Sequence, residues 1–309
     1  MKKTVSEIEK ACDILRSGGV IGMPTETVYG LAASIQSISG LENIFKTKER
    51  PFFDPLIVHV NSISQAKSLT SDWNETCQKL ADNFWPGPLT LILDKSPEVN
   101  DLITSGLTTV GIRFPSHPKA LELIGELGHP VAAPSANKFK KISPTTAEHV
   151  SNEFPDILVL EGGQSEVGIE STIIRVQNSE LIIYRPGMIT EKELKEKLGS
   201  DFKVSLKESP IAPGHLAEHY RPIKPLILKL ESENIDSPYQ SPLTWTVPSQ
   251  ATLAARQLYS KLRELDQKDG DCIEVLITEE MTQDDQFRGI LNRLYKAASL
   301  KSNRIKSEY

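Results

Sequence analysis

Residues 41–60 read LENIFKTKERPFFDPLIVHV and combine a helix, a cationic turn and a buried strand in one run. Apolar positions in the first half recur at helical spacing, which predicts a helix that brings the chain to Lys48. The apolar run 56–60, which follows the turn, predicts a strand. A helix that leads into a buried strand is the repeating unit of an α/β fold.

The same alternation continues on both sides of this stretch. Helices are predicted at 6–16, 62–70, 73–84, 118–127, 145–152 and 190–200. Strands are predicted at 20–23, 89–93, 109–114, 131–133, 157–160, 171–176 and 181–184. Some of these strands are spaced as in hairpins, so we expect a twisted mixed sheet flanked by helices.

A smaller unit follows a change in composition, because residues 209–225 are rich in Pro, Gly and His and indicate a linker. Beyond it, predicted strands and helices alternate at 226–230, 243–247, 249–266, 273–277 and 284–300. This alternation predicts a Rossmann-like α/β domain with a parallel core. We therefore expect a first domain at 1–205, a linker at 206–225 and a C-terminal domain at 226–309.

The composition is that of an ordinary globular protein of 309 residues, with 39% hydrophobic and 25% charged residues. The formal net charge of −6 argues against nucleic acid as the principal partner. Cys12, Cys77 and Cys272 lie far apart, which favours reduced thiols over disulfides or a zinc site. The N-terminus turns acidic early, and no apolar run reaches the roughly 18 residues of a membrane span. We expect a cytoplasmic protein without a membrane segment.

Polar side chains gather at predicted strand ends, where α/β sheets build their sites. They are Thr25, Thr27, Lys48, Arg50, His59, Arg113, Ser135, Asn137, Ser171, Thr172 and Arg185. Arginine grips phosphate or carboxylate through a planar fork, and hydroxyls and amides add neutral hydrogen bonds. The pattern predicts an enzyme that binds phosphate or carboxylate. Arg50 is expected on a strand-end loop, where a cation contributes little to stability, so its replacement by alanine should leave the fold intact.

The common nucleotide motifs and metal motifs are missing from the sequence. Neither a Walker phosphate loop nor a Gly-x-Gly-x-x-Gly is present. His215 and His219 stand at i, i+4, but the linker composition around them disfavours a metal site. We expect no metal held by protein side chains.

Seven segments resemble the YrdC family and occur in that family's order. They are PTETVYGL at 24–31, KERP at 48–51, PLIVH at 55–59, WPGPLT at 85–90, RFPSHP at 113–118, APSAN at 133–137 and GIEST at 168–172. The longer, two-domain members are also resembled by APG at 212–214, by His219-Tyr220 and by ILNRL at 290–294. The resemblance spans nearly the whole chain.

This resemblance implies a nucleotidyltransferase that makes L-threonylcarbamoyl-AMP from L-threonine, bicarbonate and ATP and releases pyrophosphate. The product feeds N6-threonylcarbamoyladenosine formation at position 37 of tRNAs that read codons beginning with A. A downstream threonylcarbamoyl-transferase complex is the implied partner. We expect direct tRNA binding to be weak or absent, and Mg2+ to arrive with ATP.

The resemblance also implies roles for individual residues. The ATP-binding residues would be Lys48, Arg50, Asp54, Thr109, Ser135, Asn137, Ser143, Arg185 and Tyr220. The threonine-binding residues would be Thr27, His59, Arg113, Ala133 and Ser171. Lys48 and Arg50 would be catalytic, because cations relieve the repulsion between a carbamate and the α-phosphate. Tyr220 would close over the nucleotide as part of a lid formed by the linker.

Three segments depart from the family pattern. Asp54 stands where the family usually has Asn, so a carboxylate there could repel phosphate or help to place Mg2+. Residues 138–142 lack the usual Ser-Gly pair, which predicts a stiffer and more basic loop. The linker also has Gly214-His215 and Tyr220-Arg221-Pro222, where a Met and an Ala are usual.

Two other functions fit parts of the pattern. An RNA-binding module of the same fold would use a basic concave face, but the acidic total and the scarcity of aromatic residues disfavour it. A carbamoyl-transfer maturation enzyme would carry zinc-finger cysteines, which this chain lacks. The C-terminal domain shows no catalytic group, so we expect it to anchor the lid or to dock a partner rather than to bind a regulatory ligand.

Overall fold

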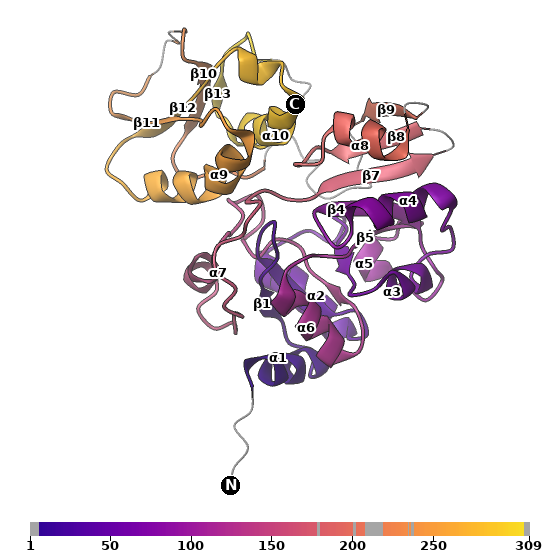
Figure 1. The fold of residues 1–309 in the computed structure, drawn as a ribbon. Helices are drawn as coiled ribbons and strands as arrows, with labels where there is room; N and C mark the ends of the chain where they lie inside the picture. The colour runs from indigo at the N-terminus through magenta and orange to yellow at the C-terminus, as the bar shows by residue number, and fades with distance from the viewer. Residues whose placement is uncertain are drawn as a thin grey trace.

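The computed structural model describes residues 6–177, 180–199, 202–207, 219–233, 235 and 238–305, and Figure 1 shows their arrangement. A nine-stranded sheet organises the N-terminal part of the chain and a four-stranded sheet organises the C-terminal part. Within the described residues, every helix is too short or too polar to cross a membrane.

The large sheet is mixed, with the order β1-β2-β6-β3-β5-β4-β7-β8-β9. Its strands are β1 (Ile21–Met23), β2 (Gly30–Ser34), β3 (Ile57–His59), β4 (Leu89–Asp94), β5 (Thr109–Arg113), β6 (Val131–Ala132), β7 (Thr172–Gln177), β8 (Glu180–Arg185) and β9 (Lys203–Leu206). β3 and β5 pair in parallel, whereas β6 runs antiparallel to β3. The predicted mixed sheet flanked by helices is confirmed.

Helices pack on this sheet through apolar faces. They are α1 (Glu7–Arg16), α2 (Ile38–Lys48), α3 (Ile63–Ser68), α4 (Glu75–Phe84), α5 (Asp101–Thr104), α6 (Pro118–Leu127), α7 (Ala147–Glu153) and α8 (Glu191–Leu198). α1 begins with a capping box between Ser6 and Glu9, which satisfies two main-chain N–H groups. α2 ends at Lys48, and the next residue, Glu49, has a φ of 53° that turns the chain sharply into the Arg50 loop.

Several predicted elements were wrong or incomplete. The apolar segment 157–160 is not a strand, because it pairs with β1 only at the bridge between Val159 and Gly22. β2 was missed, because apart from Leu31 its sequence GLAAS consists of small residues with little strand propensity. β9 and α5 were also missed, because neither is longer than four residues.

The small sheet is entirely parallel, with the order β11-β12-β10-β13. Its elements are β10 (Leu226–Leu230), β11 (Pro242–Thr246), α9 (Ala251–Asp266), β12 (Cys272–Ile277), η1 (Glu280–Thr282), η2 (Asp285–Phe287), α10 (Arg288–Ala297) and β13 (Leu300–Lys301). The predicted parallel core is therefore present. The helix predicted at 284–300 is shorter, and a 3-10 turn precedes it.

The two sheets share one apolar core across their junction. Val28, Ile142 and Ile169 from the N-terminal part belong to the same buried cluster as Leu258 of α9 and Leu294 of α10. Most of the predicted linker, residues 208–218, lies outside the described residues. The two parts are therefore held together by packing as well as by the chain that connects them.

Glycines bring main chains into direct contact at this junction. A Cβ atom on Gly289 would lie 2.6 Å from the main-chain oxygen of Gly187. A Cβ atom on Gly168 would lie 2.5 Å from the main-chain oxygen of Ala255, in α9. Both distances are too short for real carbon atoms, so larger residues at these positions would force the two parts of the chain apart.

We expect Gly289→Ala to lower the free energy of unfolding by about 2 kcal/mol, because it overpacks a contact between two main chains. Gly125→Ala is the matched control: it lies on an exposed face of α6 with only an Asn61 amide nearby, at 3.4 Å. Helix propensity predicts unchanged or slightly higher stability for the control. Urea unfolding of both variants tests this, and equal stabilities would contradict the close packing.

Candidate active site

A pocket lies along β3 and collects most of the residues predicted to bind ligands. The predicted residues that line it are Thr27, Arg50, His59, Arg113, Ala133, Ser135, Ser171, Arg185 and Tyr220. Thr25, Val28, Gly30, Pro55, Ile57, Pro134, Glu170 and His219 complete the lining. Arg50 precedes β3, and His59 is its last residue. The predicted groups therefore lie at both ends of β3, and not all at the same edge of the sheet. The pocket therefore has two halves, one at the Arg50 end of β3 and one at the His59 end.

Arg50 is held at the first half by its own loop. Its Nε and Nη2 atoms donate to the main-chain oxygens of Asp54 and Pro55, at 3.2 and 2.9 Å. Its guanidinium forms an ion pair with the Asp54 carboxylate at 2.9 Å, and both side chains are buried. The carboxylate four residues later holds the guanidinium inside the protein, so Arg50 is tied to the fold more closely than a strand-end loop cation was expected to be.

Lys48 and Asn137 lie behind this half of the pocket and brace its wall. The Lys48 ammonium donates to the main-chain oxygens of Ser135 and Asn137. The Asn137 amide donates to the main-chain oxygens of Lys138 and Lys141, at 2.7 and 3.0 Å. Burial, and then the nearby Arg50 guanidinium, lower the pKa of Lys48 well below its usual range. These contacts present Ser135 to the pocket.

Arg113 dominates the second half. Its Nη1 atom donates to the Thr27 hydroxyl at 2.8 Å, and its Nη2 atom pairs with the Glu26 carboxylate at 2.6 Å. His59 is its direct neighbour in the β3–β5 register. Burial, and then the Arg113 charge, lower the pKa of His59 to about 3, so the imidazole is neutral at physiological pH. Glu26 was not among the predicted residues, although it lies between Thr25 and Thr27 in the sequence.

Ser171 and Arg185 form one unit beside Arg113. The Arg185 guanidinium donates to the main-chain oxygen of Ser171 and to its hydroxyl, both at 3.1 Å. The Ser171 hydroxyl also lies 2.7 Å from the Thr90 hydroxyl on β4. These hydrogen bonds hold the Ser171 hydroxyl where the second half of the pocket begins.

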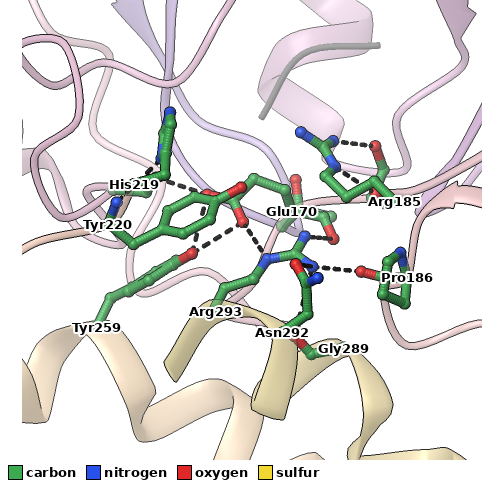
Figure 2. A network of polar contacts seen from close by, with 12 residues as sticks. Glu170, Arg185, Pro186, His219, Tyr220, Tyr259, Gly289, Asn292 and Arg293 are labelled. Carbon is green, nitrogen blue, oxygen red and sulfur yellow. Dashed lines mark hydrogen bonds and ion pairs between the residues drawn. The ribbon is translucent and has the colours of Figure 1, made fainter. Parts of the chain in front are cut away.

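Glu170 is a buried carboxylate that the sequence analysis did not single out. It accepts a hydrogen bond from the Tyr259 hydroxyl at 2.9 Å and pairs with Arg293 at 2.9 Å (Figure 2). It also accepts a hydrogen bond from the Ser143 hydroxyl at 2.5 Å. Burial alone would raise its pKa, but the Arg293 and Arg185 charges and the hydrogen bonds lower the pKa of Glu170 to about 2. Ser143 therefore faces Glu170 rather than the open pocket.

Tyr220 closes one side of the pocket from the linker. It is buried, has a φ of 62°, and stacks on Tyr259 with ring centroids 5.8 Å apart. Its neighbour His219 also lines the pocket, and burial lowers the pKa of His219 to about 3. His215 lies outside the described residues, and the described part of the chain holds no group of three or more His, Cys, Asp or Glu side chains suited to a metal.

Thr109 and Asp54 were predicted to bind ATP, but neither lines the pocket. Thr109 starts β5 on the side where the Arg50 loop enters β3, but it does not line the pocket. Asp54 was expected to face the nucleotide region, and it instead pairs with Arg50 beneath the pocket surface. The loop at 138–142 makes a bridge from Lys141 to Arg221 on the linker.

Comparisons with known proteins cover nearly the whole chain. The profile of the Sua5/YciO/YrdC family, described as telomere recombination, matches residues 13–187. A second profile, described as the C-terminal domain of threonylcarbamoyl-AMP synthase, matches residues 189–299. These two matches meet within two residues of each other, after Gly187.

Individual relatives agree with the family profiles. A Bacillus subtilis threonylcarbamoyl-AMP synthase is 36% identical over 94% of this chain and 93% of its own length. A Pyrococcus abyssi protein of the same name is 32% identical over 94% of both chains. The crystal structure of Pyrococcus abyssi Sua5 complexed with L-threonine superposes with a TM-score of 0.85, at 31% identity, over 97% of this chain and 98% of that one.

The depressed pKa of Glu170 predicts acid sensitivity. A carboxylate with a folded pKa of about 2 stabilises the protein above its unfolded pKa, and this stabilisation is lost as the pH falls from about 5 to about 2. The loss should reach about 3 kcal/mol. We expect Glu170→Gln to flatten the pH dependence of urea unfolding in this range.

Glu264→Gln is the control for this experiment. Glu264 pairs with Lys261 on the exposed face of α9 and with Lys268 just beyond the end of that helix, where water screens the charges. Its replacement should leave the acid slope nearly unchanged. An identical slope in wild type and Glu170→Gln would contradict a charged Glu170 in the folded protein.

Proposed function

The chain belongs to the Sua5/YciO/YrdC family, and we propose that it synthesises threonylcarbamoyl-AMP from L-threonine, bicarbonate and ATP, with release of pyrophosphate. The observation that carries this proposal is the pocket along β3, which has an Arg50 end and an Arg113 end. A reaction that joins an amino-acid carbamate to a nucleotide needs two anion sites in one cavity. The reaction is a nucleotidyl transfer.

The Arg50 end is the proposed ATP half. Arg50 offers its guanidinium to the phosphates, and Ser135 offers a hydroxyl and main-chain groups on the turn that Lys48 holds. Arg185 lines the same cavity beside Ser171 and is proposed to reach ATP from there. Asp54 and Asn137 support this half from behind, and Tyr220 lines the pocket from the linker. Ser143 and Thr109 are buried and do not line the pocket, so their proposed roles toward ATP are indirect.

The Arg113 end is the proposed threonine half. Thr27 and Glu26 each take one nitrogen of the Arg113 fork, so the guanidinium is held in a fixed orientation toward the pocket. A fixed fork suits the threonine carboxylate. His59 is neutral, and its Nδ1 atom is buried without a hydrogen-bond partner, so it offers a polar contact for the threonine hydroxyl. Ala133 and Ser171 complete this half.

The chemistry follows from this arrangement. The threonine amine adds to bicarbonate and loses water, which gives a carbamate. A carbamate oxygen then attacks the α-phosphorus, the bond to the bridging oxygen breaks, and pyrophosphate leaves with that electron pair. Guanidiniums at both ends offset the repulsion between the two anions, so catalysis is mainly positioning and electrostatics.

Mg2+ is proposed to enter as part of the ATP substrate. The carboxylates around the pocket already have cationic partners, since Glu26 pairs with Arg113, Asp54 with Arg50 and Glu170 with Arg293. The phosphate oxygens would therefore be the main ligands of the ion, together with water. This differs from the earlier idea that Asp54 helps to place Mg2+.

The product is an activated threonylcarbamoyl group, so we propose that a threonylcarbamoyl-transferase complex acting on tRNA consumes it. Direct tRNA binding by this chain is proposed to be weak, because the net charge is −6 and the pocket arginines Arg50, Arg113 and Arg185 are buried. This arrangement favours the enzyme over an RNA-binding module. The free buried thiols of Cys12, Cys77 and Cys272 suit the cytoplasm.

The first test omits each substrate in turn. Purified protein should release pyrophosphate from ATP only when threonine and bicarbonate are both present, because the carbamate must form before it can attack the α-phosphorus. Enzyme-coupled detection of pyrophosphate measures this. Release at the same rate without threonine would sink the assignment.

The second test concerns the ATP half. Arg50→Ala alone would leave Asp54 as a buried charge without its partner, so we choose the neutral pair Arg50→Gln/Asp54→Asn, which keeps the fold. The pair should lower kcat/KM for ATP about a hundredfold through the loss of one preorganised cation. Glu49→Gln/Lys138→Gln neutralises an exposed ion pair beside the same loop and should change kcat/KM less than about twofold. Equal activity of both double variants would remove Arg50 from the ATP site.

A further inference from the structure

One arginine of the C-terminal part reaches into the wall of the pocket. Arg293 stands on α10 and is 1% exposed. Its Nε atom donates to the Glu170 carboxylate at 2.9 Å, and its Nη2 atom donates to the Glu170 main-chain oxygen at 3.3 Å. Its Nη1 atom donates to the main-chain oxygen of Pro186, so one guanidinium joins two segments of the other part of the chain (Figure 2).

The two segments that Arg293 joins are those that carry the Ser171–Arg185 unit. Glu170 precedes Ser171, and Pro186 follows Arg185. Arg185 is hydrogen-bonded to both the main chain and the hydroxyl of Ser171. The position of this unit in the pocket therefore depends on a side chain more than 100 residues away in the sequence.

The surroundings leave Arg293 little freedom. Gly289, one turn earlier on α10, lies against the main chain of Gly187, so the helix cannot slide without a clash. The Glu170 carboxylate is also held by Tyr259 of α9 and by Ser143. The Arg293 guanidinium lies over the Tyr220 ring, with its central carbon 5.5 Å from the centroid of that ring. Both helices and the linker thus converge on the pair Arg293–Glu170.

We propose that Arg293 is a positioning residue of the reaction: the C-terminal domain supplies it to hold Ser171 and Arg185 in register through Glu170 and Pro186. This inference rests on the proposed function. It gives the C-terminal domain a role in the geometry of the active site, beyond anchoring the lid or docking a partner. The planar fork is essential to this role, because a lysine ammonium cannot contact both segments with the same geometry.

The first measurement compares Arg293→Lys with Arg288→Lys, which makes the same substitution on the same helix. Arg288 also crosses the junction, but it pairs with Glu191 and does not contact the pocket. Arg293→Lys should lower kcat/KM for threonine at least about tenfold, because small displacements of positioned groups are costly in rate. Arg288→Lys should stay within about twofold of wild type.

A double-mutant cycle with Ser171→Ala separates positioning from a general loss of structure. If Arg293 acts through the Ser171–Arg185 unit, Arg293→Lys should cost clearly less in the Ser171→Ala background than in wild type, because only its effect through Arg185 remains. If Arg293 only stabilises the fold, the two losses should multiply, and that result would overturn the inference. Thermal unfolding of each variant establishes that folded proteins are compared.

Measuring wild-type activity in parallel distinguishes a failure of the proposed function from a failure of the proposed role of Arg293. A wild-type protein that makes no threonylcarbamoyl-AMP would overturn the proposed function, and the present inference would fall with it. An active wild type with an equally active Arg293→Lys would overturn the role of Arg293 alone.

Discussion

Buried guanidinium groups surround the pocket, and a buried charge is stable only beside a partner that balances it. Arg50 is paired with Asp54, Arg113 with Glu26, and Arg293 with Glu170. Each partner is a carboxylate that is itself buried. The loops around the pocket take the paths that bring these charges together, so charge balance shapes the site before any substrate binds.

This balance also determines how anionic substrates are received. The guanidiniums are already oriented by hydrogen bonds, so a phosphate or carboxylate meets fixed donors instead of mobile side chains. The neutral His59 adds a polar contact without adding charge. Asp54 has a clear place in this scheme, because its carboxylate orients Arg50 from beneath the pocket. The residue that departs from the family pattern thus orients the cation at the Arg50 end of the pocket.

The junction between the two sheets follows the same constraint. Gly187 and Gly289 allow two main chains to touch, and this contact brings Arg293 within reach of Glu170. Both partners of the ion pair are buried beside the apolar cluster that includes Ile169 and Leu294. Packing and charge pairing therefore act on the same few residues, and the C-terminal part becomes a component of the pocket wall.

The sequence by itself determined the order of helices and strands, the parallel core of the C-terminal part and most of the residues that line the pocket. These features depend on local periodicity and on short motifs such as PTETVYGL and APSAN. β2 was missed because its small residues carry little local signal, and 157–160 was misread because an apolar run does not specify a pairing partner. Only the tertiary structure decided that Arg50 is buried, that Asp54 is its partner and that Glu170 is held by Arg293. The physical reason is that charge pairing depends on distance in space, and Glu170 and Arg293 are 123 residues apart along the chain.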